Sequence, residues 1–124
     1  ERKLLNNFVR SNIPAAFRTD ELPSTWSMNH YTEIPTELWT KFNDIGYSKS
    51  GCVLRMFLEA MTSDTFGKGL KYYMTKYQMT AAEPKNLHEE LQKAMDEDFP
   101  GNSVNIDSLM STWENQPGNS FNYN

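Results

Sequence analysis

The chain has 124 residues, 38% of them hydrophobic. This length fits one domain with a hydrophobic core and is too short for two domains that each form a stable core. A formal net charge of -4 with scattered lysines and arginines argues against a nucleic-acid partner. No apolar run approaches the ~20 residues that span a bilayer, so we expect no membrane insertion by this chain. Because it opens on Glu1 rather than Met, we expect a processed product or a piece of a longer protein.

The first part of the chain combines helical periodicity with a long irregular stretch. A helix, or two short ones interrupted at Pro14, is predicted over residues 2–19 by apolar side chains at helical spacing: Leu4, Leu5, Phe8, Val9 and Phe17. Residues 20–35 have no period and predict an ordered loop. Pro35 then favours a helix start whose pattern ends at Gly46.

Helical patterns fill the rest of the chain. One helix follows Gly46, carries an apolar stripe from Val53 to Met61 and ends before Ser63, a predicted N-cap. The next runs from Phe66 to about Tyr77, a third begins near Pro84, and a fourth follows Asn105 and stops at Pro117-Gly118. Tyr73 and Tyr77 are predicted to be core residues, and Gly67 and Gly69 to be close-packing positions.

Strand alternation is nowhere sustained, so the sequence predicts an all-α fold of antiparallel helical hairpins around one core. We expect a single helical domain over residues 1–118. Residues 119–124 have no period and are predicted to form a frayed tail.

Metal-binding patterns are incomplete. A helical zinc site needs two histidines four residues apart, but Gln92 stands four residues after His88, and His30 is alone in a loop. Both histidines are therefore predicted to be surface or capping residues. Residues 96–107 place acids at positions one, three and twelve of a calcium loop, yet position five is Pro100. An acidic helix end, a Pro-Gly turn and a capped helix is the simpler interpretation, with calcium binding as the alternative.

Tyr47 lies in the segment Ile45–Met56, which reads Ile-Gly-Tyr-Ser-Lys-Ser-Gly-Cys-Val-Leu-Arg-Met. This segment resembles the catalytic segment of the zinc aminopeptidases of the aminopeptidase N family, in which a lysine follows the tyrosine two residues later and small residues precede a Val/Ile-Leu/Ile-Arg-Met run. The sequence of residues 49–60 is most similar to that of insect gut forms. The resemblance extends to further segments: Glu33–Leu38, Phe42–Ile45, Phe66–Tyr73, Ala82–Leu87 and Met110–Trp113.

The resemblance implies the helical lower half of a thermolysin-like catalytic domain. It implies an enzyme that releases N-terminal amino acids from peptides through a zinc-activated water, with Tyr47 as the catalytic residue that donates its phenolic O–H to the developing oxyanion. A tyrosine just before a helix would also lie near unpaired N–H groups. The family's His-Glu-x-x-His motif and Gly-x-Met-Glu-Asn segment are absent from this sequence. We therefore expect no metal ligand and no cofactor in this chain, with zinc held elsewhere in the parent enzyme.

Two classes of function remain. In the first, the chain works with the remainder of an aminopeptidase on a peptide substrate, and the resemblance implies an extracellular or cell-surface location. In the second, it is a non-catalytic helical fragment or diverged module that binds another protein or a ligand through an exposed apolar surface.

Overall fold

The computed structural model describes residues 2–118, so the predicted frayed tail, 119–124, lies outside the described residues. The described part is helical and contains no strand, which confirms the all-α prediction. The helices form two compact units, one made of residues up to Arg55 together with those from Thr112 on, and one made of Met56–Ser111. The single domain expected over residues 1–118 stays a prediction.

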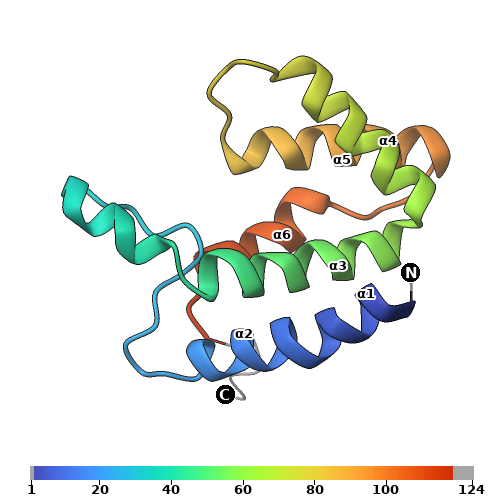
Figure 1. Cartoon of the computed structure of the whole chain (residues 1–124). Helices are drawn as coiled ribbons and strands as arrows, with labels where there is room; N and C mark the ends of the chain where they lie inside the picture. Colours follow the sequence, from blue (N-terminus) through green and yellow to red (C-terminus); the bar gives the residue numbers. More distant parts are fainter. Residues whose placement is uncertain (1, 119–124) are drawn as a thin grey trace. The chain divides into compact units, whose positions relative to one another are not determined.

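The first unit begins with one continuous helical run (Figure 1, blue), composed of α1 (Arg2–Asn7), the π-helical segment η1 (Phe8–Asn12) and α2 (Ile13–Asp20). Proline has no backbone N–H, and in a regular α-helix its ring collides with the carbonyl four residues earlier. The wider π turn ends at Asn12, two residues before Pro14, and accommodates that ring. The interruption predicted at Pro14 is thus a local widening rather than a break.

The irregular stretch after α2 is held at Asn29. Its backbone N–H donates to the carbonyl of Glu114 at 3.0 Å, and its side chain donates to Asn115 at 3.2 Å, which ties the loop to the end of α6 (Ile106–Asn115). The helix predicted from Pro35 is a 3₁₀ helix, η2 (Pro35–Lys41). Its Trp39 side chain is exposed, as is Phe42 just after it.

A second π-helical segment, η3 (Ile45–Lys49), leads directly into α3 (Ser50–Met61). The stripe predicted on this helix is confirmed in its centre, because side chains four residues apart are buried: Val53, Phe57 and Met61. Leu54 and Leu58 on its flank are half-buried.

The second unit contains a helical hairpin formed by α4 (Ser63–Lys76) and α5 (Pro84–Asp98), visible in Figure 1. The N-cap of α4 is Thr62 rather than the predicted Ser63, since the Thr62 hydroxyl accepts the backbone N–H of Thr65. Gly69 lies at a close approach of the two helices, where a Cβ atom would come within 2.8 Å of a Leu91 methyl carbon. Gly67 has nothing within 4 Å of such an atom, so the close-packing prediction is right for Gly69 and wrong for Gly67.

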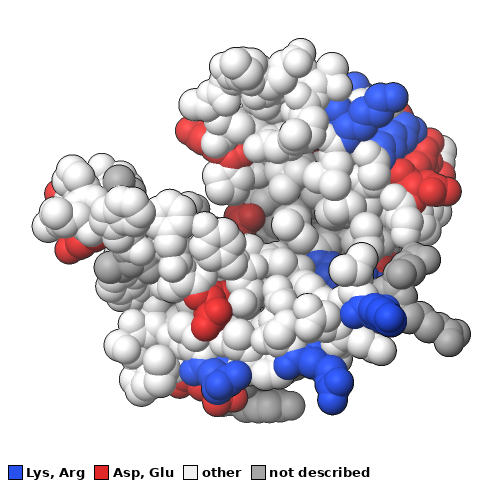
Figure 2. Space-filling model, viewed as in Figure 1, with Lys and Arg blue, Asp and Glu red and all other residues white. Residues whose placement is uncertain are grey.

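Charged side chains on the hairpin are paired rather than segregated. Figure 2 shows basic and acidic groups lying beside one another on the part built by α4 and α5, where the Lys68 ammonium lies 2.7 Å from carboxylate oxygens of both Glu97 and Asp98. Among the helices of residues 2–118, none combines the length and the apolar character that a bilayer crossing requires.

Candidate functional site

Tyr47 is the middle residue of η3, three residues before α3 begins at Ser50. The side chain of Asn43 caps this segment, because its Oδ1 accepts the backbone N–H of Ile45 at 2.9 Å and of Gly46 at 3.0 Å. The Tyr47 N–H itself donates to the carbonyl of Asn43 at 3.1 Å. The unpaired N–H groups expected around Tyr47 are therefore absent at these three positions, and the phenol is the donor that this segment can offer to a ligand.

The Tyr47 side chain is 62% exposed. Its ring contacts Phe42 at a centroid distance of 6.2 Å, and Phe42 in turn contacts Trp39 at 5.7 Å. The hydroxyl has no hydrogen-bond partner among the residues that the structure describes. A phenolic hydroxyl is both a donor and an acceptor, and this one, exposed and without a partner in the described part of the chain, is free to donate to an incoming group.

Two residues beyond Tyr47, the Lys49 side chain turns inward and is 5% exposed. Its ammonium lies 2.9 Å from Oδ1 of Asp20 at the end of α2. It also donates to the carbonyls of Gln116 and Gly118 at 3.3 and 3.2 Å. The family pattern includes this lysine but does not reveal its partner Asp20, because no local pattern links positions so far apart in the chain.

A second group of contacts holds the start of η3. One carboxylate oxygen of Asp44 accepts the Ser48 hydroxyl at 3.2 Å, and the other accepts the Thr19 hydroxyl at 3.4 Å. The segment that carries Tyr47 is thus attached to α2 both before and after the tyrosine.

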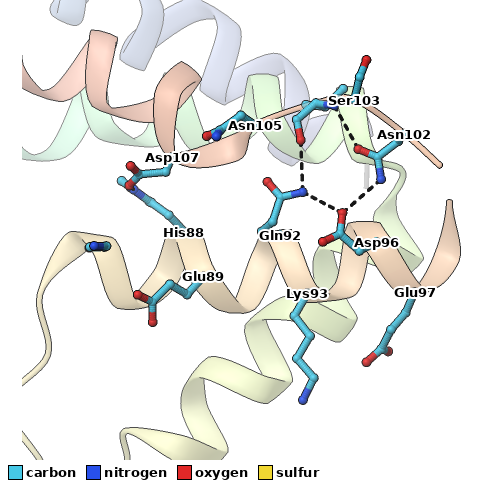
Figure 3. A pocket seen from close by; sticks show the side chains of 12 residues that line it. His88, Glu89, Gln92, Lys93, Asp96, Glu97, Asn102, Ser103, Asn105 and Asp107 are labelled. Carbon is cyan, nitrogen blue, oxygen red and sulfur yellow. Dashed lines mark hydrogen bonds and ion pairs between the residues drawn. The ribbon is translucent and has the colours of Figure 1, made fainter. Parts of the chain in front are cut away.

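Part of the candidate calcium loop, together with earlier residues of α5, lines an open groove of about 790 Å³ in the second unit (Figure 3). Its acids do not converge. Asp96 accepts hydrogen bonds from Gln92 and Asn102 at 2.8 and 3.1 Å, as the dashed lines in Figure 3 show. Asp98 instead pairs with Lys68, and Asp107 with His88.

The turn chemistry supports the simpler interpretation of this loop. Gly101 has φ +85, a backbone conformation that favours glycine, and lies three residues after the end of α5. The side-chain oxygen of Asn105 accepts the backbone N–H of Ser108 at 2.8 Å, which caps α6. Gln92 binds both the carbonyl of Val104 and the N–H of Ile106, so it fastens the loop to α5.

The two histidines differ from each other. His30 is exposed and stacks on Trp26 at a centroid distance of 4.8 Å. His88, predicted to be a surface or capping residue, is buried and therefore no surface residue, and its Nδ1 lies 2.9 Å from Asp107 Oδ1. Within residues 2–118, no group of three His, Cys, Asp or Glu side chains could hold a metal ion.

Comparison with known proteins gives a consistent result. Residues 1–113 match the family described as Peptidase family M1 domain. The chain is 28% identical to an aminopeptidase N of Plutella xylostella over 118 residues, which are 95% of the chain and 12% of that protein. It is 28% identical to a membrane alanyl aminopeptidase of Manduca sexta over 90% of the chain and 12% of that protein. A glutamyl aminopeptidase of Mus musculus is 26% identical over 94% of the chain and 12% of its own length.

Proposed function

Since this chain belongs to peptidase family M1, we propose that it forms part of a zinc-dependent aminopeptidase that releases N-terminal amino acids from peptides, with Tyr47 as a catalytic residue. The observation that carries the proposal is the exposed Tyr47 phenol, whose hydroxyl has no partner in the described part of the chain. It lies in the very segment that resembles the catalytic segment of aminopeptidases N.

The chemistry assigned to Tyr47 is hydrogen-bond donation. Cleavage of a peptide bond places negative charge on the former carbonyl oxygen, and a donor aimed at that oxygen stabilises the transition state more than the substrate. The capping by Asn43 and the attachment of Asp44 hold the tyrosine's backbone, so little reorganisation is needed when charge develops. Loss of one such donor typically lowers turnover about 10²- to 10³-fold.

The zinc that the family uses finds no site in the described residues. Three protein ligands are typical of a catalytic zinc, and residues 2–118 offer no group of three. The adjacent acids Glu97 and Asp98 are both paired with Lys68. We therefore assign no metal ligand to this chain and propose that zinc is held by residues elsewhere in the parent enzyme.

The chain spans about 12% of the length of the relatives it matches. We propose that the remainder of such an aminopeptidase is its partner and that a peptide is the substrate. The name of the Manduca sexta relative supports a cell-surface or extracellular location. The insect-like character is a proposal too, and it rests on the resemblance of residues 49–60 to insect gut forms.

A second candidate function is binding without catalysis, as a helical fragment or diverged module. Large apolar side chains on the first unit favour it, since Leu4 and Trp39 are 78% and 77% exposed. Exposed apolar groups of this size mark contact surfaces when they are contiguous. The two candidates differ in what Tyr47 does, and this difference can be measured.

The test replaces Tyr47 by phenylalanine in the full-length aminopeptidase. We expect kcat for an aminoacyl anilide to fall about 10²- to 10³-fold, with a smaller change in KM and an unchanged zinc content. Tyr31→Phe is the matched control, because Tyr31 is an exposed tyrosine in the loop before η2. Unchanged turnover in zinc-loaded Tyr47→Phe enzyme would leave the binding module as the better proposal.

A further inference from the structure

We infer that Lys49 is a positioning residue, which through its buried ion pair with Asp20 sets the direction in which Tyr47 points. The inference rests on the proposed catalytic role of Tyr47. Its starting observation is that the Lys49 and Asp20 side chains are both buried, at 5% and 2% exposure. Lysine is almost never fully buried unless it is paired, so this arrangement needs a physical account.

The contacts of Lys49 are complete. An ammonium group has three N–H donors, and the Lys49 ammonium has three acceptors: Asp20 Oδ1, the carbonyl of Gln116 and the carbonyl of Gly118. Asp20 Oδ1 also accepts the backbone N–H of Gly118 at 3.1 Å, which closes the network. Gly118 has φ +82, a conformation that favours glycine at this corner. Three segments far apart in the chain therefore meet at one ammonium group.

Stability alone does not explain the pair. Taking two charges out of water is costly, and apolar residues of similar volume in place of a buried ion pair are often equally or more stabilising. What a saturated, directional pair adds is geometry, because three fixed acceptors restrict where the ammonium and the helix that carries it can lie, whereas apolar packing tolerates sliding. Such a pair is therefore expected where the direction of a neighbouring side chain matters for function.

Tyr47 is that neighbour. A helical residue advances about 100° around the axis in an α turn and somewhat less in the wider π turn, so side chains two positions apart point to roughly opposite sides of the helix. A Lys49 that faces inward thus requires a Tyr47 that faces outward, in agreement with the exposed fractions of 4% and 62%. The i to i−5 hydrogen bond from the Lys49 N–H to the Asp44 carbonyl, at 2.9 Å, ends the π turn at the anchored residue. Fixing Lys49 therefore fixes the rotation of η3 and the aim of the phenol.

The test uses the full-length enzyme and begins with Lys49→Met, which removes the anchor and keeps the length of the side chain. A displacement of about 1 Å at a catalytic group can cost about a hundredfold in rate, so we expect kcat to fall on the order of 10²-fold with a smaller change in KM. Lys71→Met is the matched control, because Lys71 is an exposed lysine on α4, and it should retain full turnover.

A double-mutant cycle separates positioning from general damage. If Lys49 acts through Tyr47, then Lys49→Met should lower kcat little further once Tyr47 is already phenylalanine. The apolar pair Asp20→Leu with Lys49→Met should fold even where Lys49→Met alone does not, because it leaves no buried charge unpaired. That pair should keep the low kcat of Lys49→Met, since it restores the packing around position 49 and not the direction of the Tyr47 side chain.

The outcomes are distinguishable. A silent Tyr47→Phe change would overturn the proposed function and this inference with it. Tyr47 remains catalytic if Tyr47→Phe lowers kcat. The inference is then overturned if Lys49→Met has the same kcat as the Lys71→Met control. It is also overturned if the fold-losses in kcat of Lys49→Met and Tyr47→Phe multiply fully in the double variant. Full kcat in the folded apolar pair would also overturn it, since the ion pair would then be dispensable for direction.

Discussion

Replacing Gly69 by alanine tests how closely α4 and α5 approach each other. The added carbon would lie 2.8 Å from a Leu91 methyl carbon, 3.0 Å from the Leu91 Cα atom and 3.2 Å from the Glu90 carbonyl oxygen. Two of these three atoms belong to the backbone, and Leu91 is 0% exposed, so the neighbours cannot yield by a side-chain rotation alone. Overpacking of this kind costs about 1–3 kcal/mol.

Gly67→Ala is the matched control on the same helix. A Cβ atom there meets nothing within 4 Å, so only the helix-propensity gain of about 0.8–1.0 kcal/mol over glycine remains. The same gain partly offsets the strain at Gly69, which leaves a net loss of up to about 2 kcal/mol in the free energy of unfolding. The two variants should therefore differ by about 1–3 kcal/mol, with opposite signs relative to the parent chain.

The measurement is urea denaturation of the two variants and the parent chain, followed by far-ultraviolet circular dichroism. A Gly69→Ala variant as stable as Gly67→Ala would refute the reasoning, because it would mean that the helices separate at no cost. A loss in both variants would instead show that the chain tolerates no added carbon on this helix, which contradicts the open space at Gly67.

Three further predictions concern the core, the acid side of the stability curve and the metal. Phe57→Ala removes a buried ring of α3 and should cost about 3–5 kcal/mol in the free energy of unfolding, whereas Lys71→Ala on the surface should stay within about 0.5; equal effects would contradict the core assignment. The Lys68 ammonium lowers the pKa of Glu97 below 4.5 and that of Asp98 below 3.8. The contribution of these two carboxylates to the free energy of unfolding is therefore present above those values and is lost as pH falls. Lys68→Met should thus be less stable than the parent chain at pH 6, by a margin that shrinks by pH 3; a margin independent of pH would count against the pairing. The isolated chain should bind no stoichiometric zinc and hydrolyse no aminoacyl anilide, which metal analysis and a turnover assay would check; one tightly held zinc with turnover would disprove this.

The helices themselves were predictable because their signals are local. The 3.6-residue period of apolar side chains placed α4 from Phe66 to about Tyr77, and the structure extends it from Ser63 to Lys76. The cap was missed by one residue, since Thr62 and Ser63 are both good N-cap residues and the sequence does not show the positive φ of 75° at Thr62.

The burial of side chains and the pairing of residues far apart in the chain were harder to predict from the sequence. The period identifies which side chains form an apolar face, but not what covers that face, and Leu4, Val9 and Phe17 remain exposed in the chain by itself. The pairing of Asp20 with Lys49 joins an acid at the end of α2 to a lysine in η3, and neither residue carries a local signal for the other. The family pattern drew attention to Lys49 without giving a reason for it.

The exposure of Tyr47 favours a role as a hydrogen-bond donor over a role in packing the turn. From its position alone, a tyrosine at the start of an apolar helix is expected to pack a turn against the core, with its O–H bonded to a neighbour. In the structure that inward role belongs to Ile45 and Lys49, which are buried on either side of it, while the Tyr47 ring stays outside. A tyrosine that stabilised the turn by packing would be buried itself. The side chain is therefore available for a partner beyond the described residues, and a phenol that keeps its hydroxyl free is better suited to donate to such a partner than to hold the turn together.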